Sequence, residues 1–137
     1  MKAEQLEQFE ETYFDMSDFI FRNWDKEYEL LKASGAVRDA EKQKIKLEAM
    51  EEIDELFREA CREPSFDLLK KGFFSRLQEQ IDKLELEIEK AKSAEDKDHE
   101  INLRIRQGIF SGPPQGFFKA AYNDVMGIQK LKRGRPS

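Results

Sequence analysis

The sequence holds a single cysteine, Cys61, and a single histidine, His99, among 137 residues. One cysteine excludes an intramolecular disulfide. Together the two residues supply too few nitrogen and sulfur ligands for a zinc site. Carboxylate metal sites in helical bundles use Glu-x-x-His pairs, and no glutamate precedes His99 by three positions. The sequence therefore implies no metal site and no other cofactor.

Motifs for catalysis and for phosphate binding are missing as well. The chain has neither G-x-x-x-x-G-K-[ST] nor G-x-G-x-x-G. Ser111 lacks the upstream glycine of a nucleophile elbow. Cys61 falls on an apolar helical stripe, which is typical of a small core residue rather than a reactive thiol. We therefore expect no catalytic residue and a protein that is not an enzyme.

Long apolar runs are absent from the sequence. None approaches the ~20 residues that a membrane-spanning helix needs. The N-terminal stretch MKAEQLEQFEE is acidic and has no apolar segment, so it does not resemble a signal peptide. These features predict a cytoplasmic protein with no membrane partner.

Proline and glycine are scarce, at four and seven residues, and they leave long uninterrupted stretches. Eleven phenylalanines supply large apolar area to bury, which argues against a disordered chain. Charged residues make up 39% of the sequence, a composition that suits long helices and coiled coils. The expected fold is all-α: a single helical domain over residues 1–131, followed by a flexible basic arm over 132–137.

Apolar residues recur at spacings of three and four over 3–34, 38–62 and 66–92, which predicts three long helices. The apolar face of the first is wide, so we expect it to pack against more than one helix. Gly35 is placed to end it. The second carries carboxylates that read as a solvated outer face: Asp39, Glu41, Glu48, Glu51, Glu52, Asp54 and Glu55.

The third predicted helix has the most regular stripe. Its apolar residues alternate spacings of three and four, the 3.5-residue repeat of a coiled coil. We interpret this stripe as a self-association seam made of Phe74, Leu77, Ile81, Leu84 and Ile88. The repeat is short, so it could equally pair with another helix of the same chain.

The second half of the chain is less regular. Residues 101–106 alternate apolar and polar residues, which suits a short strand or, given the surroundings, one or two helical turns. The segment 111–116 contains Gly112-Pro113-Pro114 and is typical of a loop, serving as a hinge or, with its flanking phenylalanines, as a docking loop. Residues 117–131 predict a last helix.

Charge is distributed unevenly along the chain. The net charge is −5, but residues 117–137 carry +4 and the remainder −9, with an acidic pole over residues 1–31. A basic C-terminal part approaches a phosphate backbone more readily than an acidic body does. We therefore expect the C-terminal part to lead any contact with DNA. The acidic pole should then face away from the DNA or meet a basic partner protein.

The chain ends in Lys132-Arg133-Gly134-Arg135-Pro136-Ser137. Gly134 lets the backbone approach a groove floor, and Pro136 keeps the segment extended. Arginines favour the negative potential of a narrow minor groove. The tetrapeptide Arg-Gly-Arg-Pro resembles the core of an AT-hook, which implies binding to the minor groove of A·T-rich DNA. The predicted DNA-binding residues are Lys130, Lys132, Arg133, Gly134, Arg135 and Pro136.

Arg104 and Arg106 also belong to the predicted DNA-binding residues, because on a strand they would share a face and could contact phosphates. They could equally pair with Glu100 or with the acidic helices. The sequence thus predicts a DNA-binding accessory protein whose body self-associates or docks a partner. The alternatives are a helical protein-interaction subunit that acts through its acidic faces and a small subunit of a ribonucleoprotein complex.

Overall fold

A computed structural model describes residues 1–127, and all regular structure in that range is helical. The helices are α1 (Ala3–Ala33), α2 (Val37–Ala60), α3 (Phe66–Ser93), α4 (Lys97–Ser111) and α5 (Pro113–Val125). The expected all-α bundle is confirmed. The three long helices match their predicted bounds to within two residues.

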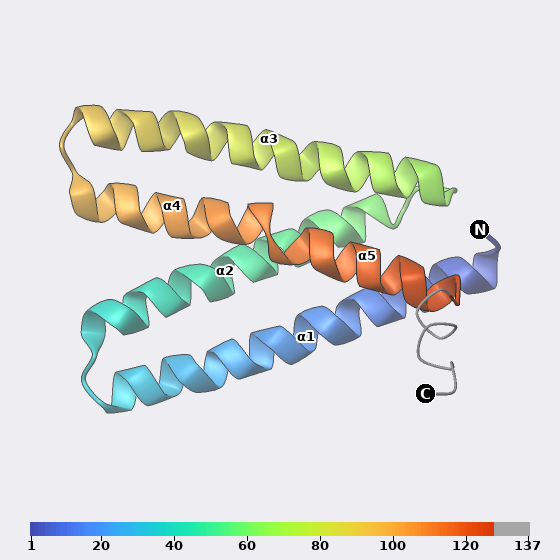
Figure 1. Cartoon of the computed structure of the whole chain (residues 1–137), viewed down its shortest axis with the longest axis horizontal. Coiled ribbons are helices and arrows are strands. Elements are labelled where there is room, and N and C mark those ends of the chain that lie inside the picture. The colour runs from blue at the N-terminus through green and yellow to red at the C-terminus, as the bar shows by residue number, and fades with distance from the viewer. Residues whose placement is uncertain (128–137) are drawn as a thin grey trace, which may run out of the picture.

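Two helical hairpins and one added helix form the bundle (Figure 1). Helix α1 packs on α2, and α3 packs on α4. Helix α2 also contacts α3 and α4, so it is the central element. Helix α5 continues roughly along the line of α4 and then lies against α1. The wide apolar face of α1 is thereby shared between α2 and α5, as the sequence predicts.

Local sequence explains where α1 and α3 end. Gly35 has a φ of +78°, and a Schellman pair of hydrogen bonds closes α1 there, from Ala36 to Leu31 and from Gly35 to Lys32. The same pair closes α3, from Asp96 to Ala91 and from Glu95 to Lys92. The left-handed position of this second turn is occupied by Glu95, with a φ of 57°.

The prediction of a loop in the second half of the chain was wrong. Residues 111–116 are not a loop, because α4 runs to Ser111 and α5 begins at Pro113. Proline is favoured in a first helical turn, where its missing N–H leaves no bond unmade. The short segment over 101–106 belongs to the 15-residue α4, so the helical alternative is correct and the strand is not.

The last helix also differs from its prediction of 117–131. It begins four residues earlier, at Pro113, and it ends at Val125. Gly127 follows with a φ of +76°, the left-handed conformation in which glycine commonly ends a helix. Residues 128–131 lie outside the described range.

The core is densest where α1, α2, α3 and α5 meet. The ring of Tyr13 stacks on Phe57 with centroids 3.7 Å apart. Phe73 meets Phe57 edge to face, and Phe118 packs against Phe9 with centroids 4.8 Å apart. All five rings are buried. The core therefore brings four helices together at the end of the bundle where α1 begins and α5 ends.

Candidate functional site

The arm residues Lys130, Lys132, Arg133, Gly134, Arg135 and Pro136 lie outside the described residues, so their role in DNA binding stays a prediction. The described residues place the end of α5 relative to α1. Helix α5 ends beside the start of α1 (Figure 1), and Met1 and Met126 line the same cavity. The expectation that the acidic pole of residues 1–31 faces away from DNA or meets a basic partner protein stays a prediction as well.

The other two predicted DNA-binding residues are engaged in ion pairs. Arg104 Nε lies 2.9 Å from Glu100 Oε2 within α4. Arg106 pairs with Glu52 of α2, and its guanidinium lies over the Phe110 ring at 5.2 Å. Both arginines thus follow the alternative in which they pair with Glu100 and with an acidic helix. Arg104 follows its partner Glu100 by four residues in the sequence, whereas Arg106 follows Glu52 by 54 residues.

The predicted self-association seam is buried within the chain. Leu77, Leu84 and Ile88 are in the core, and Phe74 and Ile81 are half-buried against it. The partners of α3 are α4 and α2. The stripe therefore serves the chain's own bundle, and its residues present little surface to a second copy.

The phenylalanines around the predicted loop are core residues too. Phe110 and Phe118 are buried, and Phe117 meets Tyr13 edge to face at 5.8 Å. These rings are packed into the core rather than free for a partner, so the described residues leave no aromatic docking loop.

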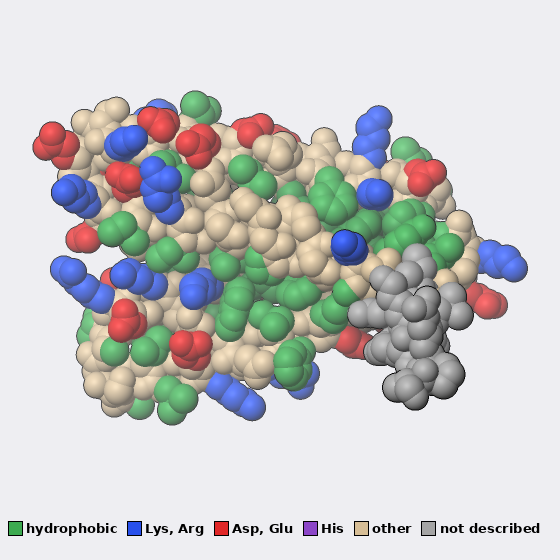
Figure 2. Space-filling view, in the orientation of Figure 1, with side chains coloured by type: hydrophobic (Ala, Val, Ile, Leu, Met, Phe, Trp, Pro, Cys, Tyr) green, Lys and Arg blue, Asp and Glu red, His purple; other side chains and the backbone are tan. Residues whose placement is uncertain are grey.

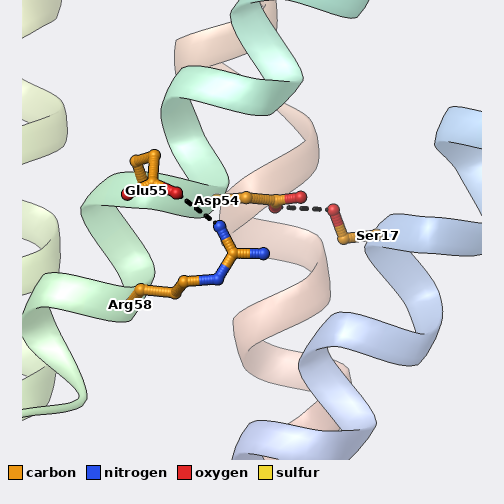
Figure 3. Close-up of polar contacts among 4 residues, drawn as sticks. All are labelled: Ser17, Asp54, Glu55 and Arg58. Atoms are coloured by element: carbon orange, nitrogen blue, oxygen red, sulfur yellow. Dashed lines mark hydrogen bonds and ion pairs between the residues drawn. The ribbon is translucent and has the colours of Figure 1, made fainter.

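A polar cluster at the interface of α1 and α2 escaped the sequence analysis. The buried Ser17 hydroxyl donates a 2.7 Å hydrogen bond to Oδ1 of Asp54 (Figure 3). Asp54 was assigned to the solvated outer face of the second helix, which is wrong because α1 covers it. The only available signal was that Ser17 continues the i, i+4 row of Phe9 and Tyr13, which places it on the buried face.

Burial raises the pKa of Asp54, while the Ser17 hydrogen bond and the Arg58 charge lower it and Asp18 and Glu51 raise it. Arg58 itself pairs with Glu55 at 2.6 Å (Figure 3). Burial likewise raises the pKa of Glu10, whereas a hydrogen bond with Cys61 lowers it by a smaller amount. Asp54 and Glu10 are thus carboxyl groups whose charged forms the fold disfavours.

Two further groups near this cluster, the Cys61 thiol and the Tyr13 phenol, are poor nucleophiles because their pKa values are raised. Burial and then the Glu10 charge raise the pKa of Cys61 to about 12, so near neutral pH the thiol is protonated and a poor nucleophile. Burial and then Asp54 raise the pKa of the Tyr13 phenol. The Tyr13 hydroxyl is buried and has no hydrogen-bond partner within residues 1–127. The cluster offers polarity and no activated nucleophile.

A cavity opens beside this core, at the end of the bundle. Its volume is about 640 Å³, within the range of small-molecule sites. Aromatic rings of α3 and α5 line it together with two lysines. Its lining residues are Met1, Pro64, Ser65, Phe66, Asp67, Lys70, Phe74, Gln115, Phe118, Lys119, Tyr122 and Met126.

Within residues 1–127, no three His, Cys, Asp or Glu side chains are grouped so that they could hold a metal ion. No helix in the same range is both long and apolar enough to cross a membrane. Comparisons with protein-family models, with curated proteins and with solved structures gave no match.

Proposed function

We propose that the protein is a small, non-enzymatic DNA-binding accessory protein, in which a helical body carries a basic arm to the minor groove of A·T-rich DNA. The observation that carries the proposal is the sequence Arg133-Gly134-Arg135-Pro136 beyond the last helix. Arginine inserted into a narrow minor groove reads A·T content through the groove's width and potential.

The arrangement of cations in the body supports this division of labour. The guanidinium groups of Arg104 and Arg106 are neutralised by Glu100 and Glu52. Residues 1–127 carry a net charge of −9, since the whole chain carries −5 and the last ten residues carry +4. An acidic body gains little from a phosphate backbone, so the arm supplies the attraction.

One hook makes few contacts, and joining two arms raises the apparent affinity by roughly 10²–10⁴ when both reach the DNA. Self-association would then use a surface other than the stripe of α3. The turn between α1 and α2 offers one, since Leu30 and Val37 are exposed there at 70% and 65%.

The test compares full-length variants on A·T-rich and G·C-rich duplexes of equal length by fluorescence anisotropy. Arg133→Ala and Arg135→Ala should each weaken binding to the A·T-rich duplex by roughly tenfold, with less effect on the other. Lys130→Ala and Lys132→Ala should weaken both alike and lower the salt slope by about 1 each. Arg104→Ala is the matched control and should change neither. Equal losses on both duplexes for all four arm variants would leave only a generic basic tail.

A second function is favoured by a specific observation on α1. Glu4, Glu7 and Glu11 are exposed on its first turns, and none forms an ion pair with a residue in the range 1–127. Such a row is available to a basic partner protein. In this alternative the chain is an interaction subunit, an adaptor or an inhibitor of a nucleic-acid machine.

Replacing these three glutamates with glutamine distinguishes the two proposed functions, because each function predicts a different change in binding. For an interaction subunit, the triple variant associates more slowly with its partner, and the rate depends less on salt. For a DNA-binding protein, the variant binds duplex DNA modestly more tightly, because the body repels the phosphate backbone less. Glu10 is left unchanged because it is half-buried against Cys61.

A further inference from the structure

The cavity at the end of the bundle has a rigid aromatic floor. Phe66 packs against Tyr122 with ring centroids 5.3 Å apart, and Phe74 packs against Phe118 at 4.9 Å. Phe118 in turn contacts the buried ring of Phe9 at 4.8 Å. The floor is thus an extension of the core, and an apolar group placed there meets ring faces that are already held in position.

Helical spacing places cations beside this floor. Phe66, Lys70 and Phe74 follow each other at four-residue intervals along α3 and share one face of it. Lys119 lies three residues before Tyr122 on α5. Both lysines line the cavity. In Figure 2, apolar side chains gather at this end of the molecule with Lys and Arg side chains beside them.

The two lysines are not neutralised by the part of the chain that the structure describes. Both are exposed, and neither has a carboxylate within ion-pair distance there. Asp67 is the one carboxylate among the lining side chains. The cavity therefore has a local positive balance on a body that is otherwise strongly acidic.

We propose that this cavity binds a small anionic molecule with an apolar, ring-sized body, whose anionic group lies between Lys70 and Lys119. The charge balance of the lining selects the anionic group. The aromatic floor selects the apolar body, since aromatic rings that pack against each other gain more than the area they bury alone provides. The acidic body repels simple anions at long range, so neither part of the ligand suffices alone. The residues that line this cavity are separate from the predicted DNA-binding residues.

The experiment uses the full-length chain and two isosteric probes, 2-naphthoate and the neutral 2-naphthamide. Binding is followed by titration calorimetry and by ¹H–¹³C shifts of the aromatic rings. The proposal expects naphthoate to bind at least tenfold more tightly than naphthamide. It also expects the largest shifts at Phe66, Phe74 and Tyr122, with a rise in melting temperature as naphthoate is added.

Charge variants then test the assignment of the anionic group. Lys70→Gln and Lys119→Gln should each weaken naphthoate binding by at least fivefold and leave naphthamide unchanged. Lys71→Gln is the matched control, because Lys71 is exposed on the same helix but does not line the cavity. All three are surface changes, so a circular dichroism melt should show folded proteins. Equal affinity for the two probes, shifts centred elsewhere, or the same affinity in the Lys70, Lys119 and Lys71 variants would overturn the proposal.

Discussion

Tyr13 of α1 stacks on Phe57 of α2 with a ring separation of 3.7 Å and an angle of 12°, yet its hydroxyl is buried without a hydrogen-bond partner among the described residues. The ring stabilises the junction of the two helices. The hydroxyl opposes it, because a buried polar group without a partner loses its hydrogen bonds to water.

Tyr13→Phe should therefore keep the stack and remove the penalty. We expect the free energy of unfolding to rise by about 1 kcal/mol in urea denaturation. Tyr28→Phe, at a half-buried position of the same helix, is the control and should change it by less than about 0.5 kcal/mol. A destabilised Tyr13→Phe protein would show that the hydroxyl is hydrogen-bonded in solution.

Asp54 makes stability depend on pH. Because its pKa is raised on folding, the folded state holds the proton more tightly than the unfolded state. This contribution is present at low pH and is lost as the pH rises through the pKa of the folded state. Asp54→Asn should therefore be more stable than the parent at pH 7, and the difference should vanish below about pH 4. Denaturation at a series of pH values measures it.

Ser17→Ala provides the converse test of the same pair. The Ser17 hydroxyl lowers the pKa of Asp54, so its loss should raise that pKa further and destabilise the protein most at neutral pH. A carboxyl ¹³C titration of Asp54 reads the shift directly. An unchanged Asp54 titration would mean that the Ser17 hydrogen bond does not persist in solution.

The turn after α3 contains a residue, Glu95, whose replacement should stabilise the protein. Glu95 has a φ of 57°, a conformation that costs a residue with a Cβ roughly 1 kcal/mol relative to glycine. Glu95→Gly should raise the free energy of unfolding by about 0.5–1 kcal/mol. Gly35→Ala, at the matching position after α1, should lower it by about 1 kcal/mol. If both changes have the same sign, the two turns are not equivalent.

The location of the α3 stripe is tested by a pair of leucines two residues apart. Leu84 is 4% exposed and Leu86 is 66% exposed. Leu84→Asp should bury an unpaired charge and abolish the cooperative melt, whereas Leu86→Asp should leave helicity and melting nearly unchanged. Sedimentation and far-ultraviolet circular dichroism measure both. A Leu84→Asp protein that stays folded but changes from oligomer to monomer would place the stripe between chains.

Periodicity alone predicted the long helices well, since α1, α2 and α3 each bury a face that recurs every three to four residues. Periodicity failed where the same residue type is common both in loops and at the ends of helices. Pro113 and Pro114 suggested a loop, but proline also opens helices, and only the packing of α5 against α1 decides between these uses. Gly127 indicates the end of a helix, but the apolar residues that follow it in the sequence led to a predicted helix that continues to residue 131.

The side-chain partners were harder to predict than the helices. Asp54 reads as a surface carboxylate, and only the placement of α1 turns it into a half-buried partner of Ser17. Arg106 and Glu52 are 54 residues apart, so their pairing depends on how α4 crosses α2. The cavity likewise needs α3 and α5 together, which no local pattern specifies.

The contact between α1 and α5 joins the first and last helices of the described chain. During synthesis the N-terminal hairpin leaves the ribosome well before Phe118, whose ring packs against Phe9. Phe9 and the apolar residues around it therefore lack part of their cover until α5 has emerged, and such exposed apolar surface is what chaperones bind. The nascent chain therefore depends on protection of this surface over the whole interval between emergence of the N-terminal hairpin and emergence of α5.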